Sequence, residues 1–517
     1  MALFGFLLKN VLKVNKILSA GISNPSVVQE KHLRQLLLKA QHTAFGQHYK
    51  FSDLLKSSDL ISAYQKQVPV FEYDQMHEEW WCRQQTEEDI TWPGKPDYFA
   101  ISSGTTGRES KRIPVTNDML SSIQKTGQKQ IASLANFNVP APLFDKQILM
   151  LGSATKLKAN KGFLEGEITG ISAGNLPKWF KSRYYKPAPA IAAIADWDTK
   201  AQLIAEQAKN WDIAAITGIP FWMILMLEKV IEYNNLTTIH DIWPNLTFYG
   251  TGGVAFEPYR KSINKLTAHP LHIMDTYLAS EGFLAYNTRP ETMAMQLAID
   301  CGIFFEFIAL DENGFDAAGN LVENPKVLTF ASLEENKEYA LLISTPAGAW
   351  RYMIGDTIKF TSLEKLEIII SGRTKYWLNV IGAQLTEEKI NEALAQLCEE
   401  MSIHIEEYCV AAMVDENGDY YHQWILGTTD DFDSSFCAKR LDEILQYLNK
   451  NYSSSRSKVL KYVLVKSIPA AAFYDWLGAD SEKGGQLKVP KVMKEDRMKN
   501  LMAFIKETGF EEVQKRA

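Results

Sequence analysis

The chain is poor in the features that mark several common protein classes. It has only five cysteines in 517 residues, which are Cys82, Cys301, Cys398, Cys409 and Cys437. They are scattered, odd in number and form no Cys-x-x-Cys pair, which argues against a disulfide framework or a zinc ribbon and favours a reducing cytoplasm. The nine histidines are scattered as well. No ligand cluster with metal-binding spacing follows from them.

An excess of positive charge and long apolar runs are also missing. The formal net charge is −7, which argues against a general nucleic-acid binder. No uninterrupted apolar run reaches transmembrane length. The apolar segment Met1–Leu18 carries lysines inside it and predicts an amphipathic helix that packs on the body, with a membrane-surface helix as the alternative. We expect a cytoplasmic monomer without a nucleic-acid partner or stable membrane insertion.

One loop carries most of the functional signal. Residues 102–111 read Ser-Ser-Gly-Thr-Thr-Gly-Arg-Glu-Ser-Lys. Glycines let backbone N–H groups approach a ligand, hydroxyls add donors and Lys111 adds charge, so the loop suits a polyanion such as a nucleotide triphosphate. Its alternative is an ordinary polar loop. It is not a Walker A loop, because Glu109 stands where that motif requires glycine.

Short apolar segments alternate with longer helical ones over most of the chain, which is the rhythm of an α/β fold. The expected strands are Asp97–Ile101, Gln147–Gly152, Ile213–Gly218, Leu246–Tyr249, His272–Thr276, Ile303–Ala309 and Tyr339–Ser344; the expected helices include Thr116–Ala135, Lys200–Lys209 and Pro220–Asn234. A smaller α+β unit with its own helices and strands begins near Gly372. We therefore predict a large domain of residues 1–371 and a small domain of residues 372–517.

Five further motifs contain residue types that bind nucleotides. They are Gly250–Gly253, Asp275–Gly282, Trp350–Asp356, Gly372-Arg373 and Gly484–Lys491. A glycine-rich turn after a strand is a common ligand site in α/β folds. Tyr277 can stack on a base, Ser280 can bond a phosphate, and Glu281 is an oxygen ligand suited to Mg²⁺.

The remaining motifs add a ribose acceptor and positive charge. Asp356 can accept both ribose hydroxyls, Arg373 can reach the ribose or a phosphate, and Lys488 lies in a glycine-containing loop. Each residue also has a plainer interpretation: a tight turn, a solvated acid, a surface ion pair or a solvated lysine.

Taken in order, these motifs resemble those of the adenylate-forming superfamily. Ser102–Lys111, Tyr277–Gly282 and Arg351–Asp356 are similar to the three signature motifs of the Gretchen Hagen family, the auxin-responsive acyl-acid amido synthetases. Gln41–Gly46 and Val68–Val70 resemble the N-terminal pattern of that family.

The resemblance implies a fold and a reaction. The fold is a large N-terminal adenylate-forming domain, with mixed sheets, flanking helices and a partly barrel-like form, and a small mobile C-terminal α+β domain. Members use ATP and Mg²⁺ to convert a carboxylic acid to an acyl-adenylate with release of pyrophosphate. An amine, usually of an amino acid, then displaces AMP to give an amide.

The same resemblance assigns roles to residues of this chain. It implies that the phosphates are held by Ser102, Ser103, Thr105 and Thr106, and that the adenine is bordered by Gly252 and Gly253 and packed on by Tyr277. It also implies that Glu281 binds Mg²⁺ and that Asp356 holds the ribose with Arg373 beside it. Lys488 is implied to approach the reacting phosphate and carboxylate. Mg²⁺ and Lys488 offset the repulsion between the two reacting anions. No Ser-His-Asp or Cys-His arrangement stands out, and none is needed.

Three departures affect substrate identity more than adenylation. The loop has Thr-Thr where plant relatives often have Thr-Ser, Leu278 is bulkier than the usual residue, and Lys491 stands where many relatives have arginine. The acyl pocket is expected near Met119–Ile131, Leu151–Gly174 and Thr217–Met223. An AMP-forming acyl-CoA ligase and a catalytically silent binding protein of the same fold remain as alternatives.

Overall fold

The computed structural model describes residues 24–510 except 103–110, 138–139, 161, 255, 317–319, 375–384, 386, 417–418, 450–451, 454–455, 457–459, 480–487 and 494. The segment expected to form the N-terminal amphipathic helix lies outside these residues. No helix within the described part is long and apolar enough to cross a membrane.

Short helices form the N-terminal region. They are α2 (Pro25–Ala40), α3 (Ala44–His48), α4 (Phe51–Leu54), α5 (Leu60–Gln67) and α6 (Tyr73–Met76). Asn24 caps α2 by accepting a hydrogen bond from the Ser26 amide, and proline stands in the first turn, where its missing N–H costs nothing. Leu33 and Leu37 are fully buried on one face of α2, which packs this region against the sheet.

A twelve-stranded mixed sheet forms the centre of the large domain, in the order β13-β12-β14-β15-β16-β11-β10-β9-β8-β7-β3-β6. Its strands are β3 (Gln147–Leu151), β6 (Tyr185–Lys186), β7 (Ile213–Gly218), β8 (Phe248–Gly252), β9 (His272–Ala279), β10 (Gly282–Tyr286), β11 (Met295–Leu297), β12 (Phe304–Ala309), β13 (Val327–Leu328), β14 (Glu338–Ser344), β15 (Tyr352–Ser362) and β16 (Glu367–Arg373). Pairing is parallel from β6 to β9 and antiparallel from β9 to β13. The candidate site lies where the pairing changes.

Helices and a second sheet surround this centre. The helices are α7 (Asn117–Ser133), α8 (Ile168–Gly174), α9 (Lys178–Arg183), α10 (Pro189–Ala192), α11 (Trp197–Gln207), α12 (Pro220–Asn234) and α13 (Arg260–Lys265). The second sheet has the order β2-β1-β5-β4, with β1 (Tyr98–Ser102), β2 (Lys111–Val115), β4 (Lys158–Asn160) and β5 (Phe163–Gly166). Thr116 caps α7 by accepting from the Met119 amide.

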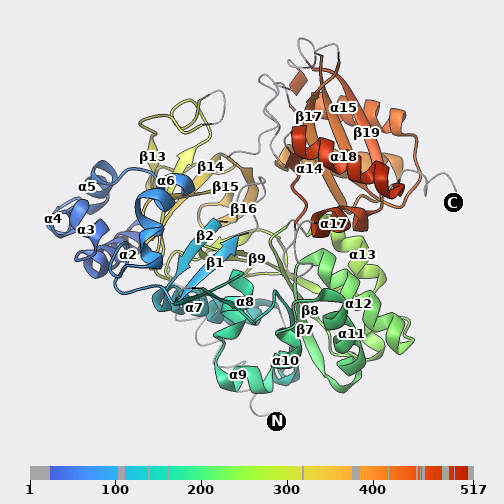
Figure 1. Cartoon of the computed structure of the whole chain (residues 1–517), viewed down its shortest axis with the longest axis horizontal. Helices are drawn as coiled ribbons and strands as arrows, with labels where there is room; N and C mark the ends of the chain where they lie inside the picture. The colour runs from blue at the N-terminus through green and yellow to red at the C-terminus, as the bar shows by residue number, and fades with distance from the viewer. Residues whose placement is uncertain are drawn as a thin grey trace.

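The smaller C-terminal domain is α+β. Its sheet has the order β19-β18-β17-β20, with β17 (Glu407–Val414), β18 (Tyr420–Gly427), β19 (Leu460–Ile468) and β20 (Val492–Met493). Its helices are α14 (Glu387–Met401), α15 (Ser434–Leu448), α17 (Ala470–Ala479) and α18 (Glu495–Thr508). Figure 1 shows this domain at the upper right, with α17 at its junction with the large domain near α12 and α13.

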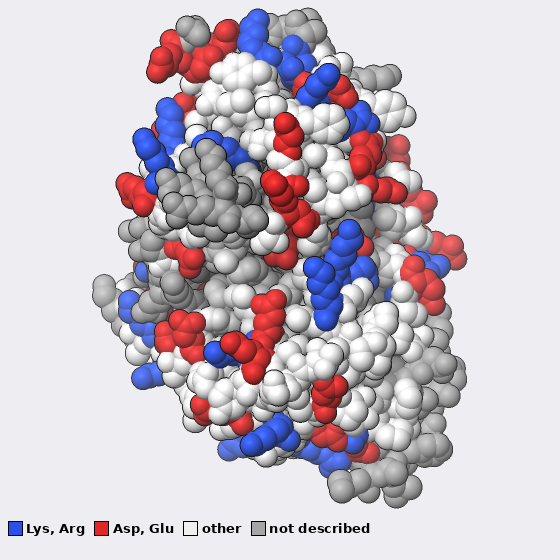
Figure 2. Space-filling view, turned by 90° about the vertical axis from the view of Figure 1, so that its right-hand side faces the viewer, with Lys and Arg blue, Asp and Glu red and all other residues white. Residues whose placement is uncertain are grey.

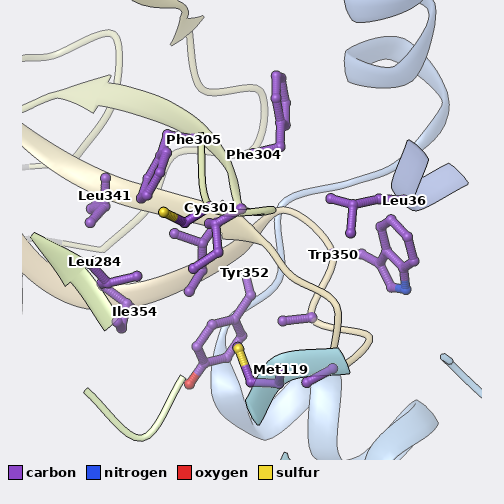
Figure 3. Packing of buried hydrophobic residues seen from close by; sticks show 14 of the residues in the cluster. Leu36, Met119, Leu284, Cys301, Phe304, Phe305, Leu341, Trp350, Tyr352 and Ile354 are labelled. Carbon is purple, nitrogen blue, oxygen red and sulfur yellow. The ribbon is translucent and has the colours of Figure 1, made fainter. Parts of the chain in front are cut away.

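The core of the large domain joins segments distant in sequence. Trp350 is fully buried and its ring stacks on that of Phe45, with centroids 5.8 Å apart. Figure 3 shows Trp350 near Leu36 and Tyr352 beside Met119. A second core continues from α11 and α12 into β17 and α17 of the small domain. On the face seen in Figure 2, acidic and basic side chains are interspersed.

Most expected elements are present, with shifted ends. β7 and α12 match the predicted bounds, whereas β9 runs on to Ala279 and β8 to Gly252. Gly250, expected in a turn, is therefore a strand residue, because the ladder with β9 continues through it. The α/β class with a large and a small domain is confirmed.

Candidate active site

The site is built on the hairpin between β9 and β10 and on the end of β8. Ser280 and Glu281 form the two-residue hairpin turn, since Ala279 pairs with Gly282. Gly252 lies against β9: a Cβ there would stand 2.4 Å from Thr276 Oγ1, so a side chain is excluded. Gly253 has φ +83°, a conformation that L-residues rarely adopt. Both glycines therefore let the backbone turn closely around the end of β9.

Tyr277, Asp356 and Arg373 form a direct hydrogen-bonded group. The Tyr277 hydroxyl donates to Asp356 Oδ2 at 2.6 Å, and Arg373 Nε donates to Asp356 Oδ1 at 2.7 Å. Asp356 and Arg373 are register partners on β15 and β16, but Tyr277 lies on β9, four strands away from β15 in the sheet. The sheet must therefore curl to bring them together, in line with the partly barrel-like form that we expected.

Glu281 is a buried carboxylate with little local compensation. It is 7% exposed, and the Tyr352 hydroxyl donates to it over a long 3.4 Å. Burial raises the pKa of Glu281, and the nearby negative charge of Asp356 adds to this, whereas the positive charge of Lys111 opposes it. A carboxylate in this environment is suited to bind a cation. Among the described residues, no group of three His, Cys, Asp or Glu side chains could hold a metal ion on its own.

Lys488 of the small domain reaches the large domain at Gly253. A Cβ atom at residue 253 would stand 2.9 Å from Lys488 Nζ and 3.0 Å from its Cε. The ammonium group thus occupies space that only a glycine leaves open. The two residues are 235 positions apart in sequence, and the contact brings the predicted late lysine to the predicted adenine-side loop.

The hydroxyl-rich loop is described only at its edges. Ser102 ends β1 and pairs with Lys111 at the start of β2, so the loop between them is a connection within a hairpin. Ser103, Thr105 and Thr106 lie outside the described residues. Lys111 Nζ lies 5.0 Å from the centroid of the Tyr73 ring, and its charge acts on Glu281. Lys111, at the start of β2, therefore lies on the Glu281 side of the site.

Two motif residues have structural roles. Arg351 is 3% exposed; its Nη1 donates to the carbonyls of Gln65 and Val68 at 2.8 and 2.6 Å, and its Nε donates to Glu306. Trp350 Nε1 donates to the Thr91 carbonyl at 3.1 Å. The beginning of the third motif thus ties the N-terminal helices to β15, which places Asp356 further along the same strand.

Asp275 is a site residue that sequence reasoning did not single out. It precedes Tyr277 by two positions and pairs with Thr251 in the β8–β9 ladder. Burial raises the pKa of Asp275 to about 7, although its Oδ1 accepts a hydrogen bond from the Thr276 amide at 2.9 Å. An acidic residue inside the expected strand His272–Thr276 was the available signal.

Glu167 and Lys200 form a second charged group that the sequence did not reveal. Glu167 precedes α8, and Lys200 is 5% exposed in the first turns of α11. Burial raises the pKa of Glu167, which a hydrogen bond with Ser153 and the positive charges of Lys488 and Lys200 oppose; burial lowers the pKa of Lys200. Among the described residues, Glu167 Oε2 is buried without a hydrogen-bond donor. Helical periodicity places Lys200 beside apolar Ala201 and Ile204, so no sequence signal marked it.

Models of three domains of one family match this chain in order. The GH3 family N-terminal domain matches residues 15–207, the GH3 family central domain residues 296–367, and the GH3 family C-terminal domain residues 388–497. Together they cover more than half of the chain.

Curated plant proteins resemble parts of it. The jasmonoyl–L-amino acid synthetase GH3.5 of Oryza sativa subsp. japonica is 26% identical over 300 residues, which are 53% of this chain and 50% of that protein. The indole-3-acetic acid-amido synthetase GH3.2 of Arabidopsis thaliana is 25% identical over 42% of each chain. The chain thus spans half or less of the length of these relatives. With the indole-3-acetic acid-amido synthetase GH3.4 of the same plant, 22% identity extends over 93% of this chain and 91% of that protein.

Solved structures share the fold across nearly the whole chain. The GH3.15 acyl acid amido synthetase matches with a TM-score of 0.76 at 16% identity, covering 96% of each chain. A 2-hydroxyisobutyryl-CoA ligase in the postadenylation state matches with a TM-score of 0.57 at 11% identity, covering 92% of this chain and 90% of that chain. Three family models matched in order, together with this shared two-domain fold, confirm the resemblance that the motifs indicated: the chain belongs to the GH3 family.

Proposed function

We propose that this protein is an AMP-forming acyl-acid amido synthetase. It activates a carboxylic acid with ATP, releases pyrophosphate, and transfers the acyl group to an amine of an amino acid. The observation that carries the proposal is Lys488 Nζ against Gly253, because a cation of the small domain then lies at the end of β8, next to β9, which carries Tyr277.

The nucleotide lies along the end of β8 and β9. Gly252 and Gly253 leave room for the adenine, and the ring of Tyr277 packs on it. Asp356 accepts hydrogen bonds from the ribose hydroxyls, and Arg373, which already donates to it at 2.7 Å, orients it. Ser102, Ser103, Thr105, Thr106 and Ser280 surround the phosphates.

Each half-reaction exchanges one bond for another, and the second also releases a proton. In the first, a substrate carboxylate oxygen attacks the α-phosphorus, and the bond from that phosphorus to the bridging oxygen of pyrophosphate breaks. In the second, the amine attacks the acyl carbon, AMP leaves, and the amine loses a proton. Lys488 lowers the barrier to the first step because its charge offsets the repulsion between the approaching anions.

Glu281 would hold Mg²⁺. The buried, weakly bonded carboxylate fits a divalent cation that takes one or two protein carboxylates plus substrate phosphates. When bound, the ion would neutralise charge on the phosphates and the leaving pyrophosphate.

The acid is held near Leu151–Gly174 and Thr217–Met223, where the polar pair Glu167 and Lys200 lies. A buried lysine and a carboxylate with an unfilled acceptor favour an acid that carries a further polar group. We therefore propose that this chain prefers a hydroxylated or otherwise polar acid to a purely hydrocarbon one, and that Lys200→Met reverses the order of preference.

The domain boundary is placed near Gly372, because β16 ends at Arg373 and the next long element, α14, already belongs to the small domain. We propose a cytoplasmic monomer without a nucleic-acid partner, in line with scattered free cysteines and net negative charge.

The second candidate function is an AMP-forming acyl-CoA ligase. It is favoured by the fold shared with the 2-hydroxyisobutyryl-CoA ligase, which uses the same two-domain architecture. The two functions differ only in the acceptor, so they share every prediction for the first half-reaction.

One experiment tests both. Pyrophosphate release is measured across a panel of aryl, alkyl and hydroxy acids, and AMP release is then measured with amino acids or with coenzyme A added. We expect acid-dependent pyrophosphate release and stimulation by one or more amino acids. Lys488→Ala is expected to slow release by about 100-fold or more with ATP binding retained. Release that no acid stimulates contradicts the enzyme proposal, and stimulation by coenzyme A alone contradicts the amide proposal.

A further inference from the structure

A buried carboxylate joins the two domains on the side of Lys488. Glu407, the first residue of β17, is 1% exposed. Its Oε1 accepts hydrogen bonds from the hydroxyls of Tyr474, at 2.5 Å, and Tyr259, and its Oε2 accepts from Lys491 Nζ at 2.5 Å. We call Glu407, Tyr259, Tyr474 and Lys491 the Glu407 cluster.

The cluster spans the domain junction. Tyr259 lies at the end of the short 3-10 helix η7 (Glu257–Tyr259) in the large domain, and it is 1% exposed. Glu407, Tyr474 and Lys491 belong to the small domain. The ring of Tyr474 also stacks on Phe221 of α12, with centroids 3.6 Å apart and planes within 3°. Ser262 of α13 donates to the neighbouring Glu406 at 3.0 Å, which adds a second polar contact across the junction.

The cluster also fixes the segment that carries Lys488. Lys491 lies three residues after Lys488, and its ammonium is held between Glu407 and the ring of Tyr408, whose centroid is 4.6 Å away. The Val410 amide donates to the Lys491 carbonyl at 2.8 Å, and Val492 pairs with Val410 as β20 joins β17. Residues 491–493, which follow closely after Lys488, are therefore attached to the same strand that begins with Glu407.

The four donors and acceptors respond differently to domain movement. If the small domain turned relative to the large one, Lys491 and Tyr474 would travel with Glu407, because all three share a domain. The bond from Tyr259 would break. That bond is buried and made to a carboxylate that is paired with Lys491, which places it among the stronger hydrogen bonds in proteins. It therefore favours the one orientation in which Lys488 meets Gly253.

We propose that Glu407 is a positioning residue: with Tyr259 it holds the small domain in the orientation that delivers Lys488 to the candidate nucleotide site, and through Lys491 it orients the segment that carries that lysine. The proposal rests on the proposed function only for its effect on rates. Its effect on the domain junction is independent of any activity.

The main variant is Tyr259→Phe, which removes one hydroxyl and leaves the Glu407–Lys491 pair intact. The matched control is Tyr452→Phe. Tyr452 is fully buried and donates at 2.7 Å to Asp442, which is in turn paired with Arg456, but all three lie inside the small domain. Both variants thus lose the same kind of bond, and only one of them loses it across the junction. Lys491→Arg serves as a conservative variant that keeps the charge.

The first measurement is amide hydrogen exchange of the full chain. Tyr259→Phe is expected to increase exchange in peptides covering residues 259–266 and 404–410 and to leave those covering α15 unchanged, whereas Tyr452→Phe gives the opposite pattern. Unchanged exchange on both sides of the junction in Tyr259→Phe overturns the proposal, whatever the protein's activity.

The second measurement separates the half-reactions. Tyr259→Phe is expected to slow acid-dependent ATP–pyrophosphate exchange about tenfold, the effect of one charge-assisted hydrogen bond. Amide formation from isolated acyl-adenylate is expected to change by less than about twofold, since it does not need Lys488 at Gly253, and Lys491→Arg retains most of the exchange activity. Equal slowing of both half-reactions overturns the positioning role. The protein could also show no ATP–pyrophosphate exchange at all, while Tyr259→Phe still increases amide hydrogen exchange at the domain junction. That result supports the role of Glu407 at the junction and contradicts the proposed function instead.

Discussion

Lys488 Nζ lies 2.9 Å from the point where a Cβ atom at residue 253 would stand. A glycine in the large domain thus makes room for a lysine of the small domain. The fit explains why a left-handed backbone at φ +83° carries no side chain there, and it makes the contact testable by adding a single methyl group.

Gly253→Ala is expected to slow pyrophosphate release at least tenfold. The methyl group displaces the ammonium, and the positive φ adds about 1 kcal/mol of backbone strain. Gly250→Ala is the control, because a Cβ there meets Thr217 at an ordinary 3.4 Å. Steady-state kinetics and thermal unfolding of both variants provide the check, and similar rates for the two would contradict the assigned position of Lys488.

Asp356→Asn is expected to raise the KM for ATP about 10- to 100-fold, since an amide accepts only one of the two ribose bonds and loses the Arg373 ion pair. The same change should matter little for 2′,3′-dideoxy-ATP, which lacks both hydroxyls. Tyr277→Phe, which keeps Asp356 but removes its 2.6 Å bond, should have a smaller effect. An equal rise in KM for ATP and for 2′,3′-dideoxy-ATP would argue against recognition of the ribose by Asp356.

Glu281→Gln is expected to increase the Mg²⁺ concentration needed for half-maximal activity by tenfold or more. Burial raises the pKa of Glu281, so its proton competes with the cation at a higher pH than for an ordinary glutamate. In the unmodified protein the Mg²⁺ requirement should therefore rise as the pH falls, and in the variant this dependence should disappear. Titrations with Mg²⁺ between pH 5 and 8 measure both effects, and an unchanged requirement would remove Glu281 from the metal site.

Asp275→Asn is expected to stabilise the protein above neutral pH. The folded pKa is raised from 3.8 to about 7, so folding favours the protonated carboxyl. The contribution of this protonated carboxyl to the free energy of unfolding is fully present below pH 4 and is lost as the pH rises to 7, with about 4 kcal/mol as the upper limit. The asparagine stays neutral and keeps the Thr276 contact. Urea unfolding at pH 4 and pH 8 should show a gain only at pH 8; equal stability at both would contradict a raised pKa.

Sequence patterns predicted the elements better than their ends. Ile213–Gly218 and Pro220–Asn234 are bounded by proline and by apolar composition, so local signals were sufficient. The ends of β8 and β9 were misplaced because Gly250 and Gly252 suggest a turn, whereas pairing with the neighbouring strand extends the ladder through them. Strand ends depend on partners that are distant in sequence.

The residues of the candidate site were likewise predicted where local motifs mark them and missed where distant contacts decide. Tyr277, Asp356 and Arg373 were predicted as one site from motif order, and the structure brings them into contact. Asp275, Glu167 and Lys200 were missed because their shifted pKa values come from burial, which local sequence does not report. Arg351 looked like part of a nucleotide motif, yet its partners are Glu306, Gln65 and Val68.

The sequence by itself determined the family, the order of the motifs and the residue types of the candidate site, because these are contained in short stretches such as 277–282 and 351–356. Only the tertiary structure decided where Lys488 goes. Its position depends on the curl of the central sheet, on the packing of α17 against α12, and on the hydrogen bonds that Glu407 accepts from both domains. Such contacts join residues that are distant in sequence, and burial supplies the low dielectric that makes them strong.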